Sequence, residues 1–294
     1  MDKRILTHWR NGLLLPSLYL LSVTPVLAAV DLGPLLAAPG ATVVLDGDTV
    51  YSSTEISLTT DKTILCNGAT IQSTGGPIRI SAPNTTLTVD DCTIEGDGWA
   101  LLGALNGAEL VVRNNTRLTG NGANSCIYVK GSVLGLSGAS IDQCRWGVNM
   151  ENAEAFIHGT HIDNTVYGIQ NVAGDVTLAG NSLLQNLDPN NPGTGVSLIA
   201  SVSYPGRRAS AVIRDTTFNG FGNAIDIQPT AAAGLPAGTV EVSDSEFNGP
   251  YWSALAAVDA ENVLFASSRV NGAFTDGLYL VNSTGVIEDV EVVD

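Results

Sequence analysis

The chain of 294 residues has few positive charges, and helical spacing of apolar residues is almost absent after residue 40. The second absence excludes a helical fold for most of the chain. Residues 1–29 contain three of the 13 Lys and Arg and one of the 29 Asp and Glu, which leaves 10 basic against 28 acidic residues and a net charge of −18. A surface this acidic repels nucleic acids and anionic membranes, so neither is expected as a partner.

The apolar run near the N-terminus is short. It covers residues 13–27, about 15 residues with two prolines, and is too short for a membrane-spanning helix. Basic residues precede it and small residues follow it, which is the pattern of a secretory signal peptide. We therefore predict that residues 1–29 are removed on export. The mature protein is then secreted, periplasmic or extracellular, without membrane insertion.

The rest of the sequence repeats a short unit. The stretch 145–149 (RWGVN) returns as 166–170 (VYGIQ), and further copies follow at equal or longer steps. Each unit contains three runs of four to six residues with alternating apolar positions, separated by Gly, Asn, Asp or Ser, as in short strands joined by turns. Variable steps above a constant minimum indicate a coil of fixed size with loops inserted at its corners.

Three short strands per coil, with the coils stacked, form an all-β parallel solenoid. One row of alternating side chains then fills the interior. The residues expected to point inward are Ile127, Val129, Val148, Met150, Ile169, Val196, Leu198, Ile225, Ile227, Leu278 and Leu280. We predict about ten coils over residues 54–294, and an N-terminal cap with a short helix and strand over residues 30–53 that covers the first coil.

A turn of Asn or Glu followed by Gly recurs at one corner of the coil. It occurs at Gly96, Gly220, Gly249 and Gly272, where glycine accepts a positive φ. The stacked Asn side chains are expected to form hydrogen bonds along the solenoid axis.

The four cysteines show neither C-x-x-C nor Cys/His spacing, so a zinc site is not expected. In an exported chain they are expected to be oxidised. Of the three pairings, the repeat register favours Cys66–Cys92 and Cys126–Cys144, because each pair joins neighbouring coils.

The short three-strand coil, the Asn-Gly turns and the segment 38–45 (APGATVVL) resemble the right-handed parallel β-helix, or pectate-lyase-like, superfamily. The resemblance covers nearly the whole chain after the leader. It implies a single-stranded right-handed parallel β-helix with a polysaccharide-binding groove along the first strand of each coil.

Outward residues on that strand form the predicted polysaccharide-binding face. The expected substrate-binding residues are Tyr128, Trp146, Asn149, Tyr167, Gln170 and Asp226. Trp146 and Tyr167 lie one coil apart, and adjacent aromatic rings offer apolar faces on which sugar rings stack. The alternative is an aromatic pair that only covers a turn.

Lys130 and Arg145 form a basic cluster in an acidic protein. Uronate lyases of the superfamily use a lysine base and an arginine acid, with a cation that neutralises the carboxylate of the substrate. The resemblance therefore makes Lys130 and Arg145 candidate catalytic residues and Glu151 a candidate Ca²⁺ ligand. The alternative is an ion pair between Lys130 and Glu151 across neighbouring coils.

Hydrolysis has less support than β-elimination. Only fragments of the polygalacturonase motifs occur, at 157–159 (IHG) and 78–80 (IRI). Glycoside hydrolysis needs a pair of carboxylates, and Asp226 has no carboxylate at the matching position of a neighbouring coil.

Two functions stay open: a carbohydrate-active or carbohydrate-binding protein for an extracellular polysaccharide, and a non-catalytic structural or adhesive protein of the cell surface or matrix. The larger insertions, 187–193, 201–208 and 230–238, follow coils later than the basic cluster, which favours the second.

Overall fold

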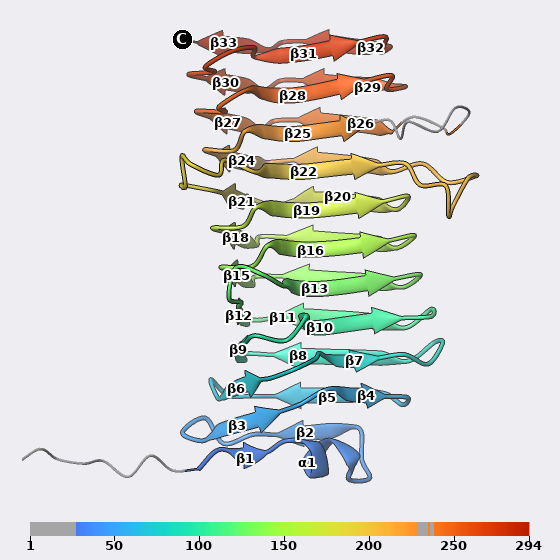
Figure 1. The fold of residues 1–294 in the computed structure, drawn as a ribbon, viewed down its shortest axis with the longest axis vertical. Coiled ribbons are helices and arrows are strands. Elements are labelled where there is room, and N and C mark those ends of the chain that lie inside the picture. The colour runs from blue at the N-terminus through green and yellow to red at the C-terminus, as the bar shows by residue number, and fades with distance from the viewer. Residues whose placement is uncertain (1–27, 229–234, 236–237, 294) are drawn as a thin grey trace, which may run out of the picture.

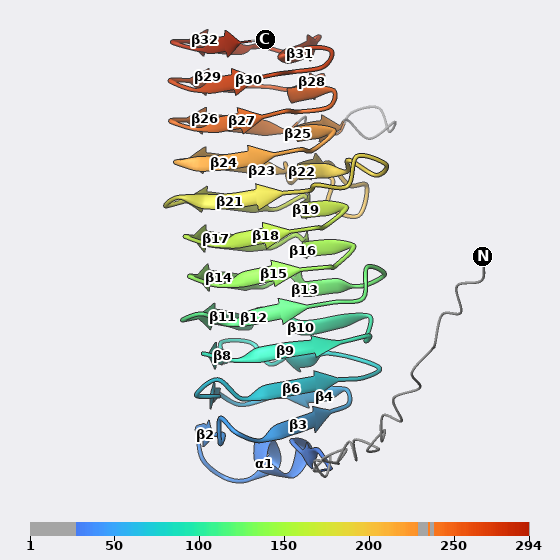
Figure 2. The ribbon, with the colours of Figure 1, turned by 90° about the vertical axis from the view of Figure 1, so that its left-hand side faces the viewer.

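In the computed structural model, residues 28–228, 235 and 238–293 are described, and they wind into a right-handed β-solenoid of about 11 turns. Figure 1 shows the coils stacked in a column, and Figure 2 shows the same column from the side. All strand pairs are parallel, so the all-β right-handed parallel β-helix expected from the sequence is confirmed. The predicted signal peptide, residues 1–29, lies outside the described residues except for its last two.

Three sheets form the sides of the column. Sheet A contains, in spatial order, β1 (Val30–Asp31), β3 (Val50–Ser53), β6 (Thr70–Ser73), β9 (Thr93–Gly96), β12 (Arg117–Thr119), β15 (Ser140–Asp142), β18 (His161–Asp163), β21 (Ser182–Gln185), β24 (Thr216–Asn219), β27 (Glu246–Asn248), β30 (Arg269–Asn271) and β33 (Glu291–Val293). Sheet B contains β2 (Thr42–Val44), β5 (Lys62–Leu65), β8 (Thr86–Asp90), β11 (Glu109–Arg113), β14 (Val133–Ser137), β17 (Glu154–His158), β20 (Asp175–Ala179), β23 (Ser210–Arg214), β26 (Thr239–Ser243), β29 (Val263–Ala266) and β32 (Gly285–Glu288). Sheet C contains β4 (Ile56–Leu58), β7 (Ile78–Ile80), β10 (Ala100–Leu105), β13 (Ser125–Lys130), β16 (Trp146–Glu151), β19 (Tyr167–Val172), β22 (Thr194–Ile199), β25 (Asn223–Gln228), β28 (Ser253–Val258) and β31 (Leu278–Val281).

The N-terminal segment is only partly a cap. Strand β1 and helix α1 (Gly33–Ala37) lie at the end of the column, where α1 buries Leu36. Strands β2 and β3 already pair with β5 and β6, so the ladder begins inside the segment 30–53 that the sequence assigned to the cap. Helix α1 is far too short to cross a membrane, and no longer apolar helix that could do so occurs among the described residues.

The interior is filled by the apolar row that the alternation predicted. Nine of the expected inward residues, from Ile127 to Ile227, are buried to 0 or 1% exposure. The other two, Leu278 and Leu280, lie in the last described coil, and Leu280 is 37% exposed because only one neighbouring coil packs against it. Burial therefore depends on stacking, as expected for a solenoid.

The corner between sheets A and C confirms part of the turn prediction. Gly220 has φ of +71°, and Gly249 and Gly272 have φ of +57° and +63°. Asn248 donates to Asn219 (3.0 Å), and Asn271 donates to Asn248 (2.8 Å), which forms the expected ladder. Gly96 differs, because its φ is not positive and an added Cβ would lie 1.9 Å from the backbone oxygen of Ser73. Close approach of two coils, not turn geometry, requires glycine there.

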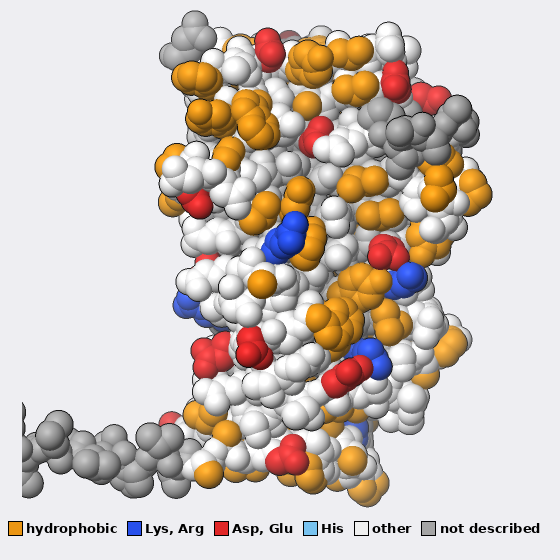
Figure 3. Space-filling view, viewed as in Figure 1, with side chains coloured by type: hydrophobic (Ala, Val, Ile, Leu, Met, Phe, Trp, Pro, Cys, Tyr) orange, Lys and Arg blue, Asp and Glu red, His pale blue; other side chains and the backbone are white. Residues whose placement is uncertain are grey.

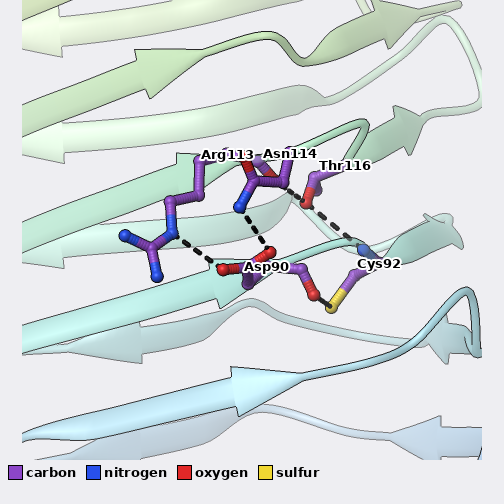
Figure 4. Close-up of polar contacts among 5 residues, drawn as sticks. All are labelled: Asp90, Cys92, Arg113, Asn114 and Thr116. Carbon is purple, nitrogen blue, oxygen red and sulfur yellow. Dashed lines mark hydrogen bonds and ion pairs between the residues drawn. The ribbon is translucent and has the colours of Figure 1, made fainter.

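Side chains at the corner between sheets B and A tie each coil to the next. Figure 4 shows the Asp90 carboxylate, which accepts hydrogen bonds from Arg113 Nε (2.8 Å) and Asn114 Nδ2 (2.9 Å) of the following coil. Beside it, the buried Thr116 hydroxyl accepts a hydrogen bond from Cys92 N at 3.3 Å. The Thr116 hydroxyl thus satisfies a backbone N–H that the turn would otherwise leave unpaired.

Both predicted disulfides are present. Cys66 bonds to Cys92 with a Cα–Cα distance of 4.9 Å, and Cys126 bonds to Cys144 with a Cα–Cα distance of 5.7 Å. All four cysteines of the chain are therefore paired. The first bridge links neighbouring coils, and the second joins β13 to the turn that follows β15, 18 residues later.

Candidate functional site

The outer face of sheet C carries the candidate residues in three rows parallel to the solenoid axis, except for Arg145, which lies in the turn just before β16. Figure 3 shows this face, with hydrophobic side chains gathered along its middle and upper parts. One row contains Tyr128, Asn149, Gln170, Ser197, Asp226, Ala256 and Tyr279. Trp146 and Tyr167 lie in a second row, and Lys130 and Glu151 lie in a third. The structure therefore brings the predicted residues to one surface, although it spreads them over several coils.

Arg145, Trp146 and Tyr167 form a continuous stack, which we call the aromatic platform. Trp146 and Tyr167 pair in register at the first positions of β16 and β19, with ring centroids 6.1 Å apart and planes inclined by 12°. The Arg145 guanidinium lies 4.5 Å from the centre of the Trp146 ring, within cation–π range. The indole N–H of Trp146 is buried without a hydrogen-bond partner, so packing holds the ring.

Arg145 differs from its basic neighbours in charge pairing. Arg79, on the same face, pairs with Glu55 at 2.7 Å, and Lys130 pairs with Glu151. Arg145 lies within ion-pair distance of none of the carboxylates in the described part of the chain. Its charge is therefore available to a ligand that reaches the platform.

Trp99 extends the aromatic surface below the platform. Its ring meets that of Tyr128 edge to face at 5.5 Å, and 46% of the residue is exposed. The repeat pattern did not single out Trp99, which immediately precedes β10. The signal that could have found it is its place just before the first strand of its coil, close to the position that Trp146 holds in β16.

Lys130 and Glu151 form the cross-coil ion pair that was the alternative to a catalytic role. The Nζ–Oε2 distance is 3.0 Å. The hydrogen bond and the charge of Glu151 raise the pKa of Lys130, whereas a lysine base needs a lowered pKa. Burial and the charge of Glu151 also raise the pKa of Tyr128. The geometry thus gives no support to Lys130 as a base, and its catalytic role stays a prediction.

The role of Glu151 as a Ca²⁺ ligand stays a prediction. Calcium prefers six to eight oxygen ligands. Glu151 is engaged with Lys130, and no group of three or more His, Cys, Asp or Glu side chains that could hold a metal comes together within residues 28–228 and 238–293.

The loop between β22 and β23 bends back toward the earlier coils. Arg207 of this loop pairs with Asp175 of β20 at 3.3 Å. After burial and Glu151 for Tyr128, and after Glu151 and Tyr128 for Lys130, Tyr204 of this loop adds a smaller contribution to the raised pKa of each group. Figure 1 shows the loop descending beside the column from the level of β22. The insertion 201–208 therefore reaches back toward the basic cluster, even though it leaves a later coil.

A groove of about 510 Å³ lies higher on the same face, and we call it the acidic groove. Its polar lining consists of Asn223, Asp226, Gln228, Ser253, Thr275 and Asp276. Its apolar lining consists of Trp252, Ala256, Val258 and Tyr279. Strands β25, β28 and β31 supply most of these residues, whereas Trp252, Thr275 and Asp276 come from the turns that precede β28 and β31.

Asp226 is the buried acid of this groove. Only 8% of the residue is exposed, and burial raises the pKa of its carboxyl, although a hydrogen bond from Gln228 opposes this shift. The matching positions in neighbouring coils are Ser197 and Ala256, as the sequence indicated. A second carboxylate nevertheless enters the groove, because the turn before β31 brings in Asp276.

Exposed aromatic side chains border the acidic groove. Trp252, 47% exposed, meets Tyr251 edge to face at 6.1 Å, and Tyr251 stacks on Phe274 of the next coil at 5.3 Å. These residues were not among those expected at the site. Their signal was the pair Tyr251–Trp252 in a turn, with Phe274 about one repeat further along the chain.

No family model matches the chain, and no curated protein matches it in sequence. Several solved structures are similar in fold. A variant of the tailspike protein of E. coli bacteriophage HK620, in complex with a pentasaccharide, matches with a TM-score of 0.52 and 12% identity over 90% of this chain and 66% of the tailspike chain. The surface adhesin PfbA of Streptococcus pneumoniae matches with a TM-score of 0.41 and 11% identity over 87% of this chain and 92% of the adhesin.

A family 28 exopolygalacturonase of Yersinia enterocolitica matches with a TM-score of 0.38 and 10% identity over 86% of this chain and 72% of the enzyme. The expected likeness to the parallel β-helix proteins is confirmed. At these identities it concerns the fold alone.

Proposed function

We propose that the protein binds an extended polysaccharide along the outer face of sheet C, with the aromatic platform as its main contact. The observation that carries this proposal is the stack of Arg145, Trp146 and Tyr167 on the same straight face as the acidic groove. Flat apolar rings with polar groups beside them match the alternating apolar and hydroxyl surfaces of sugars.

The dimensions of the face suit a polymer. The platform begins in β16, and Asp226 lies in β25, three coils higher. Three coil spacings of ~4.8 Å separate the two sites by roughly 14 Å. A chain that lies along the axis reaches both sites at once, and two linked contacts strengthen binding beyond either alone. The tailspike of similar fold holds a pentasaccharide, which supports a glycan ligand for this architecture.

Binding without cleavage is the form that we favour. The raised pKa of Lys130 and its pairing with Glu151 argue against the lysine base of a uronate lyase. A binder of this kind also fits the structural or adhesive alternative, because a rigid column displays the glycan-binding face at a fixed angle. The two disulfides support an extracellular or periplasmic site of action.

The test is affinity electrophoresis of the purified protein through gels that contain either galactomannan, a neutral polymer, or polygalacturonate, an acidic one. The double variant Trp146→Ala, Tyr167→Ala should weaken retardation on the order of tenfold, because truncation of aromatic anchors removes most of a contact. Phe156→Ala is the matched control, since Phe156 is an exposed aromatic residue (55%) on sheet B.

Equal retardation of the double variant and the control would refute the platform. If neither polymer retards the unaltered protein, the proposed function is refuted. Incubation with polygalacturonate and Ca²⁺ should give no rise in the absorbance of unsaturated products. Such a rise would instead support lyase activity.

A further inference from the structure

Three hydrogen-bond donors of the acidic groove are already engaged within the protein. The Ser253 hydroxyl already donates to Asn223 Oδ1 at 2.8 Å. The Thr275 hydroxyl donates to the backbone carbonyl of Trp252. The Gln228 side-chain amide donates one hydrogen bond to the Asp226 carboxylate. The two carboxylates, Asp226 and Asp276, offer a ligand acceptor oxygens only.

The charge of the groove has one sign. Asp226 and Asp276 both line it, and none of its described lining residues is Lys or Arg. A carboxylate ligand in this groove would meet two like charges without a cation to neutralise it, which disfavours binding.

The walls fit the flat face of a sugar ring. Trp252 and Tyr279, both 47% exposed, stand among Ala256 and Val258. The volume of about 510 Å³ lies within the range typical of small-ligand sites. Apolar side chains beside two carboxylates suit a ring whose faces are apolar and whose edge carries hydroxyl donors.

We infer that the acidic groove selects a sugar unit without an acid group, an inference that rests on the proposed function. The aromatic platform lies three coils away, and its free Arg145 tolerates acidic units. The two parts of the face thus differ in the class of sugar they accept. Because of the groove, the whole face binds uniformly acidic polymers such as polygalacturonate more weakly than neutral ones.

The experiment uses the same two gels with two variants in the groove. Trp252→Ala removes the apolar wall and should weaken retardation by galactomannan on the order of tenfold. The double variant Asp226→Asn, Asp276→Asn keeps the shape but removes both charges. It should strengthen retardation by polygalacturonate at least threefold, because the repulsion is lost. Phe156→Ala is again the control, and thermal unfolding confirms that each variant is folded.

The outcomes separate this inference from the proposed function. If Trp146→Ala, Tyr167→Ala weakens binding but both groove variants behave like Phe156→Ala, the polysaccharide face stands and the selective groove is refuted. Preference of the unaltered protein for polygalacturonate over galactomannan would also overturn the inference. If neither polymer retards the unaltered protein, the proposed function fails and the inference fails with it.

Discussion

Phe247 offers a direct test of how the coils hold one another, because it lies between aromatic rings of two neighbouring coils. It is fully buried, with its ring 5.0 Å from Phe218 and parallel to it within 4°, and 5.3 Å from Phe265. Replacing a buried Phe by Ala costs about 3–5 kcal/mol. Each aromatic pair adds about 0.5–1.5 kcal/mol beyond burial. We therefore expect Phe247→Ala to destabilise the protein by about 4–5 kcal/mol, near the upper end of the range.

The loss should be local, because each coil of a solenoid contacts only its neighbours. Urea unfolding measures the total, and amide hydrogen exchange locates it. Protection should fall in β24, β27 and β30, and that of β13 and β16 should be preserved. Phe156→Ala should change the free energy of unfolding by less than about 0.5 kcal/mol, because its ring is exposed. A loss below about 1 kcal/mol for Phe247→Ala, or loss of protection spread evenly over the column, would refute the reasoning.

Two further predictions concern ionisable groups on the face of sheet C. A double-mutant cycle on Lys130 and Glu151 should give a coupling energy of about 0.2–1 kcal/mol that shrinks in salt, because both side chains are partly exposed; a salt-independent coupling above about 2 kcal/mol would contradict this. Asp226→Asn should stabilise the protein at neutral pH, because burial raises the pKa of the folded carboxyl above its unfolded value and the ionised wild type carries a penalty. The advantage should fade as pH falls through the raised pKa toward the unfolded value, and a difference in melting temperature that stays constant from neutral to acidic pH would count against it.

The repeat could be read from the sequence because it rests on local rules. Alternation with period two determines which side chains enter the core, and the shortest step between repeats determines the size of the coil. The same register placed Cys66 beside Cys92 and Trp146 beside Tyr167, since residues at equal positions of adjacent coils become neighbours. The Asn ladder followed for the same reason.

The sequence repeat could not predict the contacts that turns and loops make, because the paths of turns and loops depend on packing. Asp276 and Trp252 belong to turns before β31 and β28, and only the folded chain brings them to Asp226. The backward bend of the loop around Tyr204 and the placement of Trp99 against Tyr128 have the same origin. By itself, therefore, the sequence determined the coil and the residues that share each row, because strand periodicity is local. The tertiary structure alone decided which side chains meet as a binding surface, because variable turns escape that periodicity.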